Sequence, residues 1–126
     1  MDDKAAVTAL LADYYKAFST LNVPAILPYY HEPSLLIGPG GVAAAPTHAA
    51  LAAFFAPALD ALRARGYGRS ELSGMEVRVL SATAIMVGGT AIRYETEGME
   101  MERVGVTYLL HKAESGWKIA VLVAHS

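Results

Sequence analysis

A length of 126 residues, a formal net charge of −2 and the lack of cysteine set the first limits on this protein. The length fits one folding domain, which we expect to cover residues 1–126. A chain with no basic stripe lacks the charge pattern of a nucleic-acid binder, and one with no cysteine forms neither disulfides nor reactive thiolates. No apolar run approaches the roughly 20 residues of a membrane span, so we expect a cytoplasmic protein with no membrane partner.

Helical spacing of apolar residues dominates the first half of the chain. A first helix is expected over residues 3–20, a second, short helix over residues 24–30, and a third over residues 47–65. Each begins at a residue typical of a helix start: an aspartate, a proline and Thr47, respectively.

Strand patterns follow these helices. Residues 34–37 form a short apolar run before a glycine-rich turn, and after Gly74 the apolar period falls to two. Gly88 and Gly89 predict a bulge within the second of the later strands. The short turns between them favour antiparallel pairing. The later strands are expected over residues 75–80, 84–95, 103–112 and 117–125.

The last strand has an apolar face that ends in an imidazole. Strict alternation assigns to this face Trp117, Ile119, Val121, Val123 and His125. Such a face needs a cover, which the helices of the first half can supply. The expected fold is therefore α+β, with a cone-shaped layer of three helices on a strongly curved, mostly antiparallel sheet and a pocket between them.

Three segments carry a family resemblance: DYYKAF at 13–18; ILPYYH at 26–31 with IGPGG at 37–41; and TYLL at 107–110 with GWKI at 116–119 and AHS at 124–126. The order of elements and these segments resemble the nuclear-transport-factor-2-like superfamily, locally its SnoaL-like and ketosteroid-isomerase-like branches. The resemblance implies a cystatin-like fold with a conical pocket, and a homodimer formed through the convex face of the sheet.

The resemblance also implies where chemistry would lie. Catalytic members place an acid–base carboxylate just before the Pro-Gly turn, where this chain has Ile37 and Gly38. Tyr14 matches a hydrogen-bond donor of the isomerase, and Tyr108 falls near the position of its second donor. Since glycine cannot move a proton, the resemblance implies donors without the usual base.

Two histidines are the candidate catalytic residues, because an imidazole can act as a base near neutral pH. They are His31, at the end of the short helix, and His125. The alternative for each is a structural histidine bonded to a nearby carbonyl. The candidate ligand-binding residues share large apolar or hydrogen-bonding side chains: Tyr14, Phe18, Tyr30, Phe55, Arg93, Tyr108, Trp117, Val121 and Val123.

The direction of Arg93 stays open at this point. If its side chain faces inward, it is an anchor for an anion or carboxylate. If it faces outward, it forms a surface ion pair with Glu102 or Glu97 on a neighbouring strand or turn.

Three functions remain open. The first is binding of a small apolar or aromatic molecule in the pocket. The second is a SnoaL-like isomerase, cyclase or dehydratase that uses histidine as acid and base. The third is a homodimeric assembly module with a filled cone. The low charged share of 17% favours a homodimer. No metal or cofactor is expected, since the histidines lack ligand spacing and no phosphate loop is present.

Overall fold

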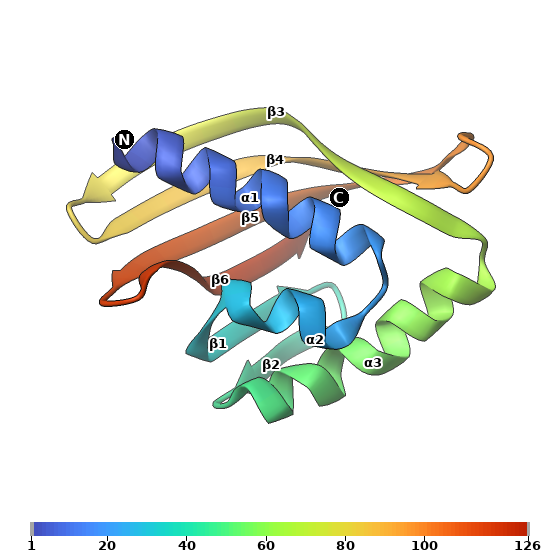
Figure 1. Cartoon of the computed structure of the whole chain (residues 1–126), viewed down its shortest axis with the longest axis horizontal. Helices are drawn as coiled ribbons and strands as arrows, with labels where there is room; N and C mark the ends of the chain where they lie inside the picture. The colour runs from blue at the N-terminus through green and yellow to red at the C-terminus, as the bar shows by residue number, and fades with distance from the viewer. Residues whose placement is uncertain (1, 126) are drawn as a thin grey trace.

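The computed structural model describes residues 2–125 and places helices against one face of a curved sheet (Figure 1). The elements in chain order are α1 (Asp3–Ser19), α2 (Val23–Ile26), the 3-10 turn η1 (Leu27–Tyr29), β1 (Tyr30–Gly38), β2 (Gly41–Ala45), α3 (His48–Ala64), β3 (Tyr67–Ser81), β4 (Ala84–Glu95), β5 (Glu100–Ala113) and β6 (Gly116–His125).

Within the described residues the strands form one six-stranded sheet in the order β2-β1-β6-β5-β4-β3. β1 runs parallel to β6, and every other neighbouring pair is antiparallel. In Figure 1, α1 crosses one face of the sheet, while α3 lies beside β1 and β2. The predicted α+β class, with three helices on a mostly antiparallel sheet, is confirmed.

The two long helices begin where their capping residues predicted. An Asp2 carboxylate oxygen accepts a hydrogen bond from the Ala5 amide at 2.7 Å. The Thr47 hydroxyl accepts one from the Ala50 amide at 3.2 Å. Each cap satisfies an amide that has no carbonyl partner in the first helical turn, which fixes the start of the helix.

The strands before β4 are longer than the apolar pattern predicted. β2 forms in an alanine-rich stretch that was not expected to be a strand, and β3 begins at Tyr67. The bulge expected in β4 lies in β3 instead, since Ser73 pairs with Thr90 and Glu76 with Gly88. Gly74 has a φ of 62° there, a left-handed conformation that glycine adopts without a steric penalty.

A second irregularity decides which residues of β6 face the helices. Leu110 pairs with Ile119 and Leu109 with Val121, so Ala120 is an extra residue that inverts the alternation. Beyond it Leu122 and Ala124 face the concave side, where they line a cavity. The prediction that Val121, Val123 and His125 continue the inward face of Trp117 and Ile119 is therefore wrong, because strict alternation takes no account of a bulge.

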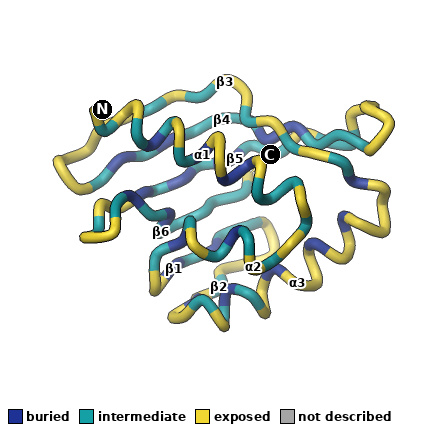
Figure 2. The backbone as a smooth tube through the Cα atoms, in the orientation of Figure 1, coloured by how far each residue is buried: buried dark blue, intermediate teal, exposed yellow. Residues whose placement is uncertain are grey.

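The core fills the space where α1 and α3 approach the sheet. Figure 2 shows buried positions on the inner sides of these helices and along the central strands. The side chains of Leu11, Leu51 and Ile119 are fully buried there. No helix in the part of the chain spanning 2–125 is both long and apolar enough to cross a membrane.

Candidate functional site

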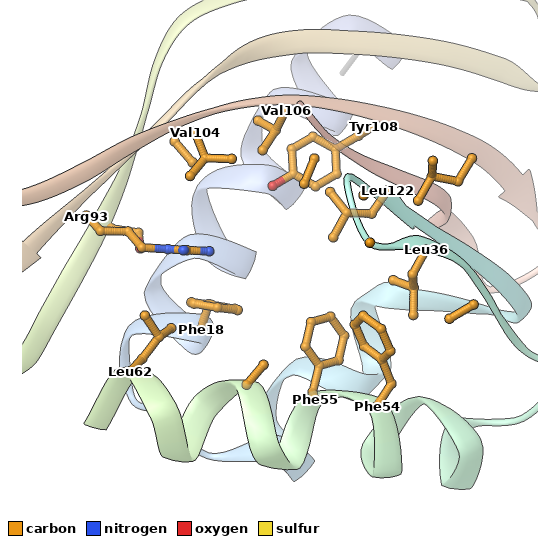
Figure 3. Close-up of a pocket in the computed structure, with 18 of the residues that line it drawn as sticks. Phe18, Leu36, Phe54, Phe55, Leu62, Arg93, Val104, Val106, Tyr108 and Leu122 are labelled. Carbon is orange, nitrogen blue, oxygen red and sulfur yellow. The ribbon is translucent and has the colours of Figure 1, made fainter. Parts of the chain in front are cut away.

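A cavity of about 550 Å³ lies between the helices and the concave face of the sheet (Figure 3). On α3 and its C-terminal capping residue Arg65, the wall is one stripe of residues with helical spacing: Phe54, Phe55, Ala58, Ala61, Leu62 and Arg65. Because Ala58 and Ala61 have short side chains, α3 leaves space in front of the sheet rather than filling it. The cone of this fold is therefore not filled by its own side chains, and the filled-cone alternative is wrong.

The strands of the sheet form the opposite wall. Leu36 of β1 and Leu122 of β6 are register partners and lie side by side at one end of the cavity. β5 adds Val104, Val106 and Tyr108, which face α3 across the open space in Figure 3. β4 contributes Ala91 and Arg93 to the same wall. The lining is thus mainly apolar, with polar groups at defined places.

Two hydrogen-bonded tyrosine pairs join α1 to the sheet. The hydroxyls of Tyr14 and Tyr30 lie 2.6 Å apart, and those of Tyr15 and Tyr108 lie 2.7 Å apart. In each pair one hydroxyl donates to the other, so the accepting hydroxyl keeps a proton that it can donate elsewhere. Tyr14, Tyr15 and Tyr108 line the cavity, whereas Tyr30 lies outside its lining. The Tyr15–Tyr108 pair, in which both residues line the cavity, therefore has a donor available for a ligand oxygen.

Burial keeps these tyrosines protonated. Loss of water around the hydroxyl raises the pKa of Tyr15 from 10.0 to about 12. The same cause raises the pKa of Tyr14, Tyr30 and Tyr108 well above 10.0. At neutral pH these groups are hydrogen-bond donors and not bases.

Arg93 combines the two arrangements that the sequence left open. Its guanidinium points into the cavity in Figure 3, and it also donates to Glu102 on the neighbouring strand. Arg65 of α3 donates to the other carboxylate oxygen of Glu102 at 2.8 Å. The hydrogen bond from Arg65 is the main reason that the pKa of Glu102 is lowered. Glu102 is therefore a charged partner of two arginines and a poor proton acceptor.

Both candidate catalytic histidines lie away from this cavity. His125 is on the outer face, where its Nε2 is 3.0 Å from the Thr107 hydroxyl, because the Ala120 bulge turns it outward. The Nδ1 of His31 is 2.9 Å from the Pro33 carbonyl, and its ring packs against that of His111. The expectation that these imidazoles reach the pocket is wrong.

The predicted ligand-binding residues divide into two groups. Tyr14, Phe18, Phe55, Arg93 and Tyr108 line the cavity, and their binding role stays a prediction. The other four lie elsewhere. Tyr30 is buried behind Tyr14, Trp117 donates its indole N–H to Asp3 at 3.2 Å, and Val121 and Val123 belong to the outer face of β6.

Several lining residues were missed from the sequence. The α3 stripe that contains Ala58 and Arg65 follows helical spacing, so the pattern itself held a usable signal. Leu122 carried no such signal, since its direction depends on the bulge at Ala120. Tyr15 also had a usable signal, since it lies four residues after Leu11 on the buried side of α1.

The acid–base position implied by the resemblance also falls on this cavity. Ile37 and Gly38 lie in its lining. Among the described residues that line it, none is aspartate, glutamate or histidine. Residues 2–125 also contain no cluster of three or more His, Asp or Glu side chains that is arranged to hold a metal ion. The described lining thus supplies neutral donors and arginine charge, without a group suited to remove a proton.

A family model described as NTF2-like protein (DUF6841) matches residues 2–126. A search of curated proteins finds no match to this chain.

Solved structures share the fold at low identity. An NTF2-like protein with a cystatin-like fold from Novosphingobium aromaticivorans has a TM-score of 0.81 at 16% identity, over 98% of this chain and 80% of that one. An NTF-2-like protein of unknown function from Shewanella oneidensis MR-1 has a TM-score of 0.78 at 21% identity, over 99% and 100%. A ketosteroid isomerase-like protein from Erwinia carotovora atroseptica has a TM-score of 0.70 at 21% identity, over 99% and 97%. The superfamily resemblance predicted from sequence is confirmed.

Proposed function

We propose that this chain, which belongs to the NTF2-like protein (DUF6841) family, binds a small, mainly apolar or aromatic molecule in the cavity between its helices and its sheet. The observation that carries the proposal is the cavity itself. Its volume of about 550 Å³ falls within the range of about 300–1,000 Å³ that is usual for small-molecule sites. An apolar wall with a few convergent polar groups is also the usual composition of such sites.

The lining supports one orientation of the ligand. Phe54 and Phe55 on α3 face Leu36 and Leu122 across one end of the cavity, where a ring or branched chain would be removed from water. The hydroxyl pair of Tyr15 and Tyr108 offers a hydrogen bond to an oxygen of the same molecule. Binding is favoured over a SnoaL-like isomerase, cyclase or dehydratase reaction, because the described lining holds no acid–base carboxylate or imidazole.

A cavity-filling substitution tests the proposal. The probe is 1-aminoanthracene, a fluorescent aromatic amine that is neutral at pH 7. Ala58→Trp places an indole in the cavity and should weaken probe binding by at least about tenfold. The control is Ala53→Trp, at an exposed position of α3 outside the lining, which should bind as the natural protein does. Failure of the natural protein to bind, or equal binding by both variants, would contradict the proposal.

We also infer that two copies associate through the outer face of the sheet. Thr107, Leu109, Val121 and Val123 lie on that face as one half-buried patch. Apolar patches of this kind on an antiparallel sheet are commonly covered by a partner. Leu122 lines the cavity and is not part of this patch, because the bulge at Ala120 puts Val121 and Val123 on the outer face instead.

A further inference from the structure

We propose that the cavity selects apolar molecules that carry a single carboxylate, and that Arg93 is the residue that pairs with it. This inference rests on the proposed binding function and names the chemical class of the ligand. It follows from an unequal count of charges at one end of the cavity, where two arginines share one glutamate.

The two arginines are held by the two oxygens of one carboxylate. Arg93 and Glu102 are direct cross-strand partners on β4 and β5, and an Nη1–H of Arg93 donates to Oε2 of Glu102. Arg65, at the end of α3, donates to Oε1. Because two positive groups meet one negative group, the cluster keeps a net charge of +1. Both oxygens of Glu102 already have a partner, so the remaining charge is available to a ligand.

Arg93 has unused donors directed to the cavity. A guanidinium has five N–H groups, and within residues 2–125 only one nitrogen of Arg93, Nη1, has a protein acceptor. Its side chain is only 26% exposed and extends into the open space between Phe18 and Val104 in Figure 3. A planar guanidinium binds a carboxylate through two parallel hydrogen bonds, and partial removal of water strengthens this attraction.

The neighbouring glutamate favours one negative charge over two. The two arginines lower the pKa of Glu102, so its carboxylate remains charged at neutral pH. A monoanion neutralises the net charge of the cluster, whereas a dianion such as a phosphate monoester would leave a net charge of −1 in the cavity. The charge therefore favours a monoanion, and the planar guanidinium favours a carboxylate among monoanions.

The arginine that would bind the carboxylate and the tyrosine hydroxyls line the same cavity. Arg93, Tyr14, Tyr15 and Tyr108 line the same cavity, and the positive charge of Arg93 acts on all three hydroxyls, opposing the larger effect of burial on their pKa. An apolar acid can thus place its carboxylate at Arg93 and its body against the aromatic wall of α3.

Matched pairs of acid and amide test the inference. Three acids of different shape, 2-naphthoic acid, 4-phenylbutyric acid and octanoic acid, are each compared with the neutral primary amide by calorimetric titration at pH 7. At least one acid should bind about tenfold more tightly than its amide, the difference expected for a charged hydrogen-bonded pair. Naphthyl phosphate, which tests the response to a dianion, should bind more weakly than 2-naphthoate.

Variants separate the charge from the fold. Arg93→Met should weaken binding of the acid about tenfold and leave the amide unchanged. Glu102→Gln removes the competing negative charge and should tighten binding of the acid, a gain that misfolding cannot produce. The control is Arg103→Met, since Arg103 is exposed, pairs with Glu100 and lies outside the cavity lining.

The outcomes distinguish the two proposals. If acids and amides bind equally, and neither Arg93→Met nor Glu102→Gln alters their ratio, the carboxylate inference is wrong while the binding function stands. If none of the acids, amides or 1-aminoanthracene binds, both proposals are wrong. Tighter binding of naphthyl phosphate than of 2-naphthoate would overturn the preference for a monoanion.

Discussion

The hydroxyl of Tyr15 on α1 lies 2.7 Å from the hydroxyl of Tyr108 on β5, so a buried hydrogen bond joins helix and sheet at the cavity wall. The two residues are 93 positions apart in the sequence. Their rings also meet edge to face, with centroids 6.4 Å apart. This contact places a polar pair inside an otherwise apolar interface, where a lost partner is costly.

A double-mutant cycle measures that pair. Tyr15→Phe and Tyr108→Phe should each lower the free energy of unfolding by about 1–2 kcal/mol, because each leaves one buried hydroxyl without its partner. The double variant should lose less free energy of unfolding than the two single variants lose together, since it leaves no buried hydroxyl without a partner. Urea unfolding checks the values. Strictly additive losses would show that the two hydroxyls are not coupled.

Alkaline pH should unfold the protein through its buried tyrosines. The folded pKa of Tyr15 is raised from 10.0 to about 12, and those of Tyr14, Tyr30 and Tyr108 are also raised. The folded state therefore keeps these protons where the unfolded chain loses them. Stability should be complete below pH 10 and fall above it, by about 1.4 kcal/mol per pH unit for each such tyrosine.

Urea unfolding between pH 8 and pH 11 checks this slope. Tyr15→Phe removes one of these tyrosine hydroxyls, so the free energy of unfolding should decrease less steeply above pH 10. The same variant should be less stable than the natural protein at neutral pH. The absorbance of ionised tyrosine should rise together with the loss of secondary structure. A stability that does not change from pH 8 to pH 11 would contradict burial of these hydroxyls.

Gly105 allows the ring of His125 to lie on the outer face. A methyl group at Gly105 would stand 2.5 Å from the His125 carbonyl oxygen and 2.7 Å from its Nδ1. Gly105→Ala should therefore destabilise the protein by about 1–3 kcal/mol. The matched control is Gly88→Ala on the same face, whose methyl group would have its nearest neighbour at 3.8 Å. Thermal unfolding of the two variants should separate them clearly, and equal melting temperatures would refute the outward position of His125.

The bulge at Ala120 makes a prediction about adjacent residues. Leu122→Ala should weaken binding of 1-aminoanthracene several-fold, because Leu122 lines the cavity. Val121→Ala, one residue earlier, should leave binding unchanged, because its side chain is on the opposite face. Fluorescence titration of both variants compares them directly. The reverse order of effects would mean that β6 has the uninterrupted alternation first expected.

The proposed dimer has its own test. Val123→Lys places a charge in the outer patch and should convert the dimer to a monomer, since an unpaired charge is costly in an apolar contact. The control, Val79→Lys, adds the same charge at a valine that is 51% exposed and outside the outer patch, and it should remain dimeric. Analytical ultracentrifugation measures the masses. A natural protein that is monomeric at high concentration would exclude the dimer.

Local sequence patterns were sufficient for the elements and for part of the cavity. The caps at Asp2 and Thr47 depend on hydrogen bonds to amides three residues away, so they can be recognised in the chain itself. The same holds for the inner face of α1, which brought Tyr14 and Phe18 to the cavity. Helical spacing is a property of neighbouring residues and needs no knowledge of the distant fold.

Only the tertiary structure decided the directions of His125, Leu122 and Arg93. Ala120 is an extra residue in the pairing of β6 with β5, and beyond it the alternation of side chains along β6 inverts. The sequence of β6 alone does not show this inversion. Arg93 faces inward because β4 keeps strict alternation through Ala91, the bulge lying in β3 instead, and Arg65 reaches the carboxylate of Glu102 from the end of α3. Strand pairing joins residues far apart in the chain, so the charged end of the cavity becomes visible only when those strands and α3 are assembled.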